Sequence, residues 1–482
     1  MTESVEPLFI CDLGRSGEEL PHFWEHTVGS GHAALALRAD WQAQMARCRR
    51  ELGFRHVRFH GLLDDEMGTL ICEKGQPVYS FFNADCIWNF LLAIDMRPFV
   101  ELSFMPTTLA SGSQTVFHYR ANVTPPTRAA DWGALIQKLA RHWLDLYGAA
   151  ELEAWLFEVW NEPNLTAFWT GTQRDYFRLY RVTARALKGV NPSLSVGGPA
   201  TAMNAWIEEF LDFCAKQDVP ADFVSTHHYP TDAIGMPGDD TETQLAESRR
   251  SVLREQARTA RRQAGHLPLY YTEWNSSSNP FDELHDRPYA AAFLVKTVME
   301  AVGLVDGYSW WTFTDIFEEN YFPSVPFHGG FGLLNIHGIP KPTYRAFQVL
   351  HGLGNERLTV DGSHPTVDAW VVRTAGGVTV LLTNWALPRH PIATERVLAR
   401  LTGASRPASA FVTRLDEDHA NPRKCWEEMG QPETLTTRNT EDLQAASSLT
   451  KEPLPVEFAD GAISFAIALP AQSVAAVSLN LP

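Results

Sequence analysis

The stretch WLFEVWNEPN at residues 155–164 decides the fold of this chain, because an apolar, β-prone run ends there in a cluster of polar residues. The stretch LYYTEWN at residues 269–275 repeats that arrangement. Both runs are apolar on consecutive residues, as parallel strands buried on two faces must be. Eight runs of this kind predict strands at Phe23–Gly29, His56–Gly61, Pro98–Phe104, Trp155–Asn161, Leu194–Gly198, Phe223–His228, Leu269–Glu273 and Gly307–Thr312.

Amphipathic stretches lie between these predicted strands. Their apolar residues fall three or four positions apart, as one buried helix face requires. Such stretches begin at Trp132, Arg174 and Thr243, and the last one continues as a single helical pattern to Gly265. Because strand and helix alternate eight times, the sequence predicts an α/β fold, a (β/α)8 TIM barrel.

The sequence pattern changes after about Arg345. Stretches such as VVRTAGGVTVLLTNW alternate apolar and polar residues and are interrupted by Gly, Pro and Asn, which indicates antiparallel strands. We expect a barrel at residues 15–345 and an antiparallel β-sandwich at residues 346–482, joined by an N-terminal strand at residues 5–14. The polar segment from Pro422 to Pro453 is predicted to be a long surface loop.

The composition excludes several classes of protein. The chain has 482 residues, with 40 Lys and Arg against 57 Asp and Glu, so its formal net charge is −17. This excess of acid disfavours nucleic acid as a partner, since a phosphate backbone requires a basic surface. The 15 Trp, 12 Tyr and 27 Phe residues exclude disorder, and Trp in a pocket can stack on a flat apolar face of a ligand.

The first residues lack the basic start and apolar run of a secretory signal, and no run approaches about 18 consecutive apolar residues. We therefore expect a cytoplasmic protein with no membrane partner. We expect a monomer, because no charged helical tail follows the last predicted strand. The cysteines show no metal-like spacing and are expected to be buried thiols. They are Cys11, Cys48, Cys72, Cys86, Cys214 and Cys425.

Chemistry in a (β/α)8 barrel lies at the carboxyl ends of the strands. Glu162 follows the fourth predicted strand, and Glu273 ends the seventh. They are 111 residues apart, which corresponds to three βα units of about 37 residues each. Either acid alone would be read as a surface charge or a helix-cap partner. Together they predict two carboxylates that face each other across one cleft. A separation of about 5–5.5 Å between them would allow retaining glycoside hydrolysis, and about 6.5–9.5 Å would allow inversion.

Other strand ends meet at the same mouth. They offer hydrogen-bonding groups and flat aromatic rings that suit a sugar. Because neighbouring residues of a strand point to opposite faces, only one of His227 and His228 can face the barrel interior. Metal binding by His60 with these histidines lacks the usual ligand spacing. Asp64 and Asp65 have a simpler interpretation as caps of a following helix.

The sequence resembles glycoside hydrolase family 39, in particular its β-xylosidase branch. The resemblance spans roughly Phe23 to Phe347 and continues more weakly beyond it. WNEPN and TEW occur across a larger clan of barrel hydrolases, whereas HGLLDD and WTFTDIFEE are more specific to this family. Further matching segments are FWEHTVGSG, PFVELSFMPTTLASG, VGGPAT and DFVSTHHYP.

The resemblance implies a barrel with a β-sandwich, a retaining mechanism, and neither a metal nor another cofactor. It also implies exo action on xylo-oligosaccharides, with Glu162 as the general acid/base and Glu273 as the nucleophile. Asn161 matches the residue that hydrogen-bonds the sugar 2-hydroxyl. The other matches are His60, His227 and Tyr229 as lining groups, Trp311 as the aromatic platform, and Glu318 and Glu319 as an acidic pair for distal hydroxyls. The Trp310–Trp311 and His227–His228 doublets each leave a choice of one position, and the His-x-Tyr spacing favours His227.

In the expected mechanism, Glu273 stays ionised with Tyr229 and His227 as donors, while Glu162 holds a proton near neutral pH. α-L-Arabinosidase activity is an open alternative, because arabinopyranose and xylose share much of their hydroxyl geometry. α-L-Iduronidase activity is less favoured, since a uronate requires Arg or Lys where this chain offers Glu318 and Glu319. A non-catalytic carbohydrate-binding protein is least favoured, because it would not require both Glu residues.

Overall fold

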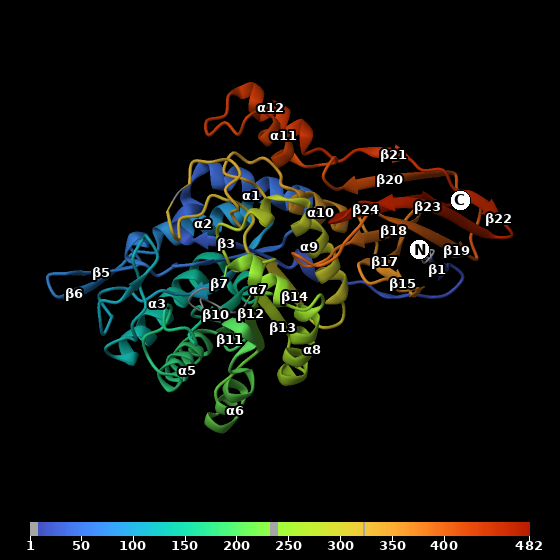
Figure 1. Ribbon diagram of the computed structural model, residues 1–482. Coiled ribbons are helices and arrows are strands. Elements are labelled where there is room, and N and C mark those ends of the chain that lie inside the picture. Colours follow the sequence, from blue (N-terminus) through green and yellow to red (C-terminus); the bar gives the residue numbers. More distant parts are fainter. Residues whose placement is uncertain (1–7, 232–239, 322) are drawn as a thin grey trace.

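The computed structural model describes residues 8–231, 240–321 and 323–482. Eight parallel strands close into a barrel in the order β10-β11-β12-β13-β14-β3-β4-β7, which confirms the predicted α/β barrel (Figure 1). Nearly all residues of these strands are buried, as the apolar runs required. They are β3 Thr27–His32, β4 His56–His60, β7 Arg97–Leu102, β10 Leu156–Val159, β11 Ser195–Thr201, β12 Phe223–His228, β13 Leu269–Trp274 and β14 Gly307–Trp310.

The first strand begins later than the sequence predicted. Phe23–Glu25 form a 3-10 turn, in which the N–H of His26 donates to the carbonyl of Phe23. The buried rings of Phe23 and Trp24 pack against each other edge to face at 5.2 Å. The turn therefore places two neighbouring rings in the core, and β3 starts only at Thr27.

Helices surround the barrel, and one predicted helix is wrong. The pattern from Thr243 to Gly265 divides into α7 and α8, with a break at residues 248–251. At this break Arg250 contacts the carbonyl oxygens of Trp385 and Thr366 and pairs with Asp368, all outside the barrel. The helices are α1 Ala39–Leu52, α2 Phe82–Ala93, α3 Ala129–Tyr147, α4 Ala149–Leu152, α5 Gln173–Val190, α6 Ile207–Gln217, α7 Thr241–Glu247, α8 Val252–Ala264, α9 Pro288–Glu300 and α10 Pro342–His351.

Two further sheets, beside the barrel in Figure 1, form the second part of the molecule. One has the order β16-β1-β19-β23-β22, and the other has the order β2-β15-β17-β18-β24-β20-β21. Their inner faces share an apolar core that includes Phe9, Val380 and Phe465. The strands are β15 Glu356–Leu358, β16 Val360–Asp361, β17 Val367–Thr374, β18 Gly377–Asn384, β19 Glu395–Thr402, β20 Ser409–Leu415, β21 Lys451–Pro453, β22 Glu457–Ala459, β23 Ala462–Leu469 and β24 Ser473–Asn480.

The start of the chain contributes to both of these sheets. β1 Leu8–Asp12 pairs with β19 in parallel orientation, although its other neighbour, β16, is antiparallel. β2 Glu18–Glu19 pairs with β15. Residues 5–7 of the predicted N-terminal strand lie outside the described residues. We expected the barrel segment to end between residues 345 and 346. That position lies inside α10, which runs from Pro342 to His351.

The segment from Pro422 to Pro453 is not the predicted surface loop. It forms α11 Pro422–Glu428 and α12 Thr437–Ala446, followed by β21. Asn421 and Thr436 cap the two helices with their side chains. The apolar side chains of this hairpin are buried against the loop between β14 and α10, in a cluster of Phe327, Ile339, Trp426 and Leu443. Contact with the barrel therefore orders a segment that looks polar in sequence.

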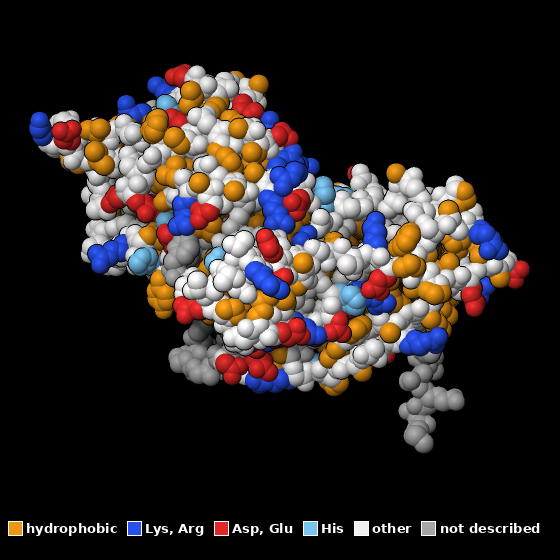
Figure 2. Space-filling view, turned by 90° about the horizontal axis from the view of Figure 1, so that it is seen from above, with side chains coloured by type: hydrophobic (Ala, Val, Ile, Leu, Met, Phe, Trp, Pro, Cys, Tyr) orange, Lys and Arg blue, Asp and Glu red, His pale blue; other side chains and the backbone are white. Residues whose placement is uncertain are grey.

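The acidic and basic side chains lie in small mixed groups on the face shown in Figure 2. No helix among the described residues is both long and apolar enough to span a bilayer. The six cysteines are free thiols, and Cys11, Cys48 and Cys214 are buried as expected. The expectation is wrong for Cys72, which is exposed on the hairpin of β5 Leu70–Glu73 and β6 Gln76–Tyr79.

Candidate active site

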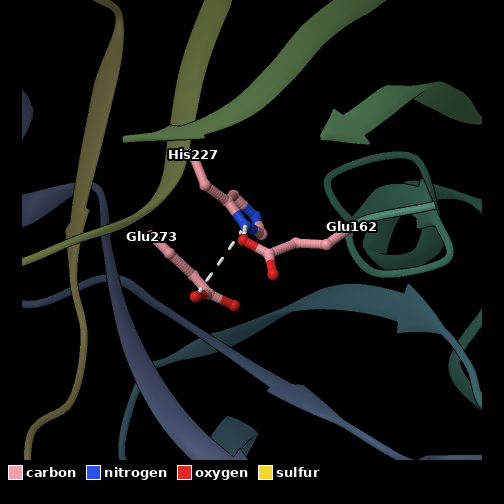
Figure 3. Close-up of side chains that lie close together, drawn as sticks. All are labelled: Glu162, His227 and Glu273. Atoms are coloured by element: carbon pink, nitrogen blue, oxygen red, sulfur yellow. Dashed lines mark hydrogen bonds and ion pairs between the residues drawn. The ribbon is translucent and has the colours of Figure 1, made fainter. Parts of the chain in front are cut away.

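Two carboxylates face each other at the carboxyl-terminal mouth of the barrel. Glu162 follows β10, and Glu273 lies in β13, three strands away around the barrel. One oxygen of each carboxylate and one ring nitrogen of His227 lie within 4.8 Å of one another (Figure 3). Such a short separation is the arrangement of retaining glycosidases, whereas inverting enzymes hold their acids about 6.5–9.5 Å apart.

The backbone around Glu162 has an unusual conformation. Trp160 and Glu162 both have positive φ angles, of 72° and 41°. Non-glycine residues seldom adopt this conformation, and where they do it is often at a functional site. The N–H of Glu162 donates to the carbonyl of Ala200 at 2.8 Å, which ties the turn to β11.

A β-bulge in β13 aims Glu273 into the mouth. Tyr271 pairs with Thr226 of β12, but Glu273 pairs with the next residue, His227, so β13 has one extra residue at this point. Because of that extra residue, the side chains of Thr272 and Glu273 both reach the barrel interior, although they are neighbours. Thr272 contacts His227 and Glu158, while Glu273 contacts Arg58.

Arg58 lies fully buried beneath the two catalytic candidates. Its guanidinium pairs with Glu273 at 2.5 Å, with Glu158 at 2.7 Å and with Glu101 at 2.7 Å. It also donates to Oδ1 of Asn161 at 3.0 Å. Burial lowers the pKa of Arg58, but the three carboxylates outweigh this and raise it. The same burial raises the pKa of Glu101 to about 7, against the opposing charge of Arg58.

Glu273 receives a second hydrogen bond, from the hydroxyl of Tyr229 at 2.9 Å. Burial raises the pKa of Glu273, and the Arg58 charge opposes that shift. Burial also raises the pKa of Tyr229, so this phenol stays a donor. The expectation that His227 donates to Glu273 is wrong. Nδ1 of His227 lies 2.9 Å from Glu162 and 3.8 Å from Glu273, outside hydrogen-bond distance of the latter.

The structure resolves both doublets. His227 points into the barrel, whereas His228 hydrogen-bonds the hydroxyl of Tyr308 at 2.7 Å and stacks on Tyr271 outside the barrel interior. His60, His227 and His228 therefore do not converge on one point. Trp311 lies 4.8 Å from the ring of His60, facing the mouth.

Trp310 faces the other way. It packs perpendicular to Trp274 at 4.9 Å and donates from Nε1 to the carbonyl of Phe331. His60 itself contacts Glu101 through Nδ1 at 2.8 Å. Burial and the charge of Arg58 lower the pKa of His60 to about 3, so its imidazole is neutral.

Glu318 and Glu319 contact different residues. Oε1 of Glu319 lies 3.5 Å from Nε2 of His60 and has no hydrogen-bond partner among the described residues. Burial, together with Glu273, Glu162 and Glu101, raises the pKa of Glu319 well above its ordinary value. Glu318 instead pairs with His32 at 2.9 Å, and this bond lowers the pKa of Glu318.

His32 is one of several functional candidates that sequence reasoning missed. Its other ring nitrogen lies 2.7 Å from Glu66, and its ring stacks on Tyr119 at 3.9 Å. Burial lowers the pKa of His32, but Glu318 and Glu66 outweigh it and raise the pKa to about 9. The other missed residues are Arg58, Glu101, Glu158 and Thr272. A charged residue inside an apolar strand, as in HVRFH, PFVEL and LFEV, was the available signal.

The side chains of Asp64 and Asp65 do not cap the short 3-10 helix Asp65–Met67 that begins there, contrary to the prediction. Asp64 is buried and accepts from the backbone N–H of Phe104, while Asp65 accepts from that of Thr107. Among the described residues, Glu162, His227 and Glu273 form the one group of three or more His, Cys, Asp or Glu side chains close enough to share a metal ion. Because Tyr229 and Arg58 already occupy Glu273 with hydrogen bonds, the group is best explained as two reacting acids.

A closed (β/α)8 barrel with two facing carboxylates at its carboxyl-terminal mouth defines a glycoside hydrolase. The chain belongs to glycosyl hydrolases family 39, whose family model matches residues 10–462. It is 48% identical to a β-xylosidase of Caldicellulosiruptor saccharolyticus, with 97% of each chain covered. It is 37% identical to a β-xylosidase of Geobacillus stearothermophilus, with 96% of this chain and 94% of the relative covered.

A solved structure, of a monomeric β-xylosidase from Caulobacter crescentus, matches with a TM-score of 0.85 and 32% identity. The match covers 98% of this chain and 99% of the other. The resemblance inferred from the motifs is thereby confirmed, and so is the arrangement of a barrel with separate antiparallel sheets.

Proposed function

We propose that this protein is a retaining β-xylosidase that removes xylose from the non-reducing end of β-1,4-xylo-oligosaccharides. The short separation of Glu162 and Glu273, within 4.8 Å, carries the mechanistic part. The substrate class is supported by the two β-xylosidase relatives, of which one is 48% identical over nearly the whole chain.

In the first step, a carboxylate oxygen of Glu273 forms a bond to the anomeric carbon as the glycosidic C–O bond breaks. Glu162 gives its proton to the departing oxygen. Arg58 and Tyr229 each hydrogen-bond one oxygen of Glu273, so they keep this carboxylate ionised and fix its orientation. Asn161, which Arg58 orients, is assigned to the sugar 2-hydroxyl.

In the second step, water attacks the anomeric carbon and the bond to Glu273 breaks. Glu162, now ionised, takes a proton from that water, so both acids return to their starting states. We assign His60, His227 and Tyr229 to the lining of the sugar subsite and Trp311 to its aromatic platform. Glu318 and Glu319 are assigned to distal hydroxyls, with Glu319 nearer to the reacting carbon because of its contact with His60.

A uronic acid substrate fits this pocket poorly. Burial and three neighbouring carboxylates raise the pKa of Glu319, and the positive charge of Arg58 opposes that shift. That guanidinium is engaged by Glu101, Glu158 and Glu273. A further carboxylate on the sugar would meet like charge. We therefore rank α-L-iduronidase activity below α-L-arabinosidase activity. An arabinoside is a neutral sugar, so the acidic residues of the pocket do not repel it.

The test is the release of p-nitrophenol from the β-D-xyloside, the α-L-arabinosides and the α-L-iduronide. We expect kcat/KM to be highest for the xyloside. A faster arabinoside would make arabinosidase the main activity, and a faster iduronide would overturn the assignment. Reaction in methanol, followed by NMR, adds the stereochemical test, because retention yields methyl β-xyloside and inversion does not.

We also propose that the protein acts as a monomer in the cytoplasm on a neutral sugar. The monomeric relative from Caulobacter crescentus supports the first part. Sedimentation velocity at micromolar concentration tests the oligomeric state, and a larger assembly would contradict it.

A further inference from the structure

A chain of three hydrogen bonds leads from the barrel interior to Glu162. The hydroxyl of Thr272 lies 2.7 Å from Oε1 of Glu158 and 3.0 Å from Nε2 of His227. Nδ1 of His227 lies 2.9 Å from Oε1 of Glu162. The bulge in β13 makes this chain possible, because it turns Thr272 inward beside Glu273.

The direction of these bonds follows from counting hydrogens. Glu158 forms an ion pair with Arg58 through its other oxygen, and an ionised carboxylate can only accept. The single hydroxyl hydrogen of Thr272 is therefore donated to Glu158. The oxygen of Thr272 is then left as an acceptor, and Nε2 of His227 must carry the hydrogen that it receives.

The remaining nitrogen of His227 then has no hydrogen. Burial lowers the pKa of His227 well below its ordinary value, and Arg58, His60 and His228 act in the same direction. The imidazole is thus neutral, with one hydrogen already placed on Nε2. Nδ1 is an acceptor, so the hydrogen between it and Glu162 belongs to the carboxyl group of Glu162.

We propose that Glu158 and Thr272 are positioning residues that act through His227 to keep the proton on Glu162 in the resting enzyme. No proton moves along the chain, since each donor keeps its own hydrogen. The inference rests on the proposed role of Glu162 as general acid. Once Glu162 has protonated the leaving group, its carboxylate faces the lone pair of Nδ1, which favours proton uptake from water in the second step.

The charged and titratable groups that face the imidazole are Glu162, Glu273, Arg58, His60 and His228. Replacing Thr272 by Val removes the acceptor for Nε2–H without altering any of these charges. His227 can then carry its hydrogen on Nδ1 and donate it to an ionised Glu162. Glu162 in Thr272→Val should therefore lose its proton at lower pH.

The first experiment is the pH profile of kcat/KM for xylobiose, whose poor leaving group requires the acid. In Thr272→Val the alkaline limb should move to lower pH by about one unit. In Thr272→Ser, which keeps the hydroxyl, the limb should stay at its wild-type position. Above neutral pH, kcat/KM for 2,4-dinitrophenyl β-xyloside should fall less than that for xylobiose. An alkaline limb that is unchanged in Thr272→Val, or that moves equally in Thr272→Ser, would overturn the inference.

Neutron diffraction of the wild-type protein at neutral pD gives a second test that needs no variant and no turnover. Deuterium is expected on Nε2 of His227 and on Glu162, and deuterium on Nδ1 would overturn the inference. The two proposals can fail separately. An inactive wild type on xylosides would refute the proposed function, whereas the neutron map decides the hydrogen-bond chain in either case.

Discussion

Nη1 of Arg58 lies 2.5 Å from Oε1 of Glu273, and the same guanidinium holds Glu101 and Glu158. The nucleophile candidate is therefore part of a buried cluster of one cation and three acids. Ion pairs of this kind are costly to bury, but they become more costly when one partner is removed. Arg58 thus connects the stability of the barrel to the orientation of Glu273.

Replacing Arg58 by Met should destabilise the protein, because three buried carboxylates lose their cation. We expect a loss of about 3–5 kcal/mol in the free energy of unfolding, measured with denaturant. Arg438→Met is the matched control, since that side chain is 90% exposed and should change stability little. Equal stability of Arg58→Met and the control would contradict the described cluster.

The two acids should respond differently to removal. Glu162→Ala should still release dinitrophenol from an activated xyloside but should lose activity on xylo-oligosaccharides. Added azide can replace the missing base in the second step, so β-xylosyl azide should form with retained configuration. Glu273→Ala should abolish turnover, and azide should not produce a retained product. If Glu162→Ala hydrolysed xylobiose at the wild-type rate, Glu162 would not be the acid.

Tyr229→Phe should weaken catalysis and shift its pH dependence. Loss of the hydroxyl bond removes a donor to ionised Glu273, so kcat/KM should fall about ten- to hundredfold. The pKa of Glu273 should rise further, which moves the acidic limb of kcat/KM to higher pH. Tyr308→Phe is the control, since that phenol pairs with His228 away from the pocket. An acidic limb that stays in place in Tyr229→Phe would refute the role of this bond.

Glu319 should matter more for the sugar than Glu318 does. Glu319 presents a buried oxygen with no partner among the described residues, whereas Glu318 is held by His32. We expect kcat/KM on the xyloside to fall about hundredfold or more in Glu319→Ala and about tenfold in Glu318→Ala. Steady-state kinetics of both variants decide this. The reverse order would show that Glu318 is the closer contact.

His228 should make the protein less stable in acid. Burial lowers the pKa of His228 to about 3, from 6.5 for an unperturbed group. The fold prefers the neutral ring, so this stabilisation is complete above pH 6.5 and is lost as pH falls towards 3. Between pH 7 and pH 5 the loss should be about 2 kcal/mol. His228→Gln should flatten the pH dependence of unfolding, and His266→Gln, at an exposed site, should not.

The barrel and its two acids could be predicted because their signals are local. Each apolar run, and the polar residues that end it, can be recognised within about ten residues. The role of Arg58 could not be predicted in this way. Its partners Glu101, Glu158 and Glu273 come from three other strands, and no local pattern specifies which side chains will meet inside a closed barrel.

The features that were predicted wrongly also depend on residues that are distant in the sequence. The segment around Trp426 and Leu443 is helical because it packs on the loop that contains Phe327 and Ile339, far away in sequence. The helix predicted from Thr243 is broken where Arg250 contacts Trp385 and Asp368. His227 lies 2.9 Å from Glu162 and 3.8 Å from Glu273, and these three side chains come from segments far apart in the sequence. Tertiary contacts decided each of these features.

The pairing of β1 with β19 can form only late in synthesis, after the barrel strands have been made. Leu8 lies beside Leu398, 390 residues later in the chain. At about 5–20 residues per second, a ribosome needs roughly 20–80 seconds to pass from one to the other. All eight barrel strands are complete by Trp310, well before β19 emerges. One of the first strands to leave the ribosome thus waits unpaired with β19 while the barrel is made, and its late docking ties the beginning of the chain to its end.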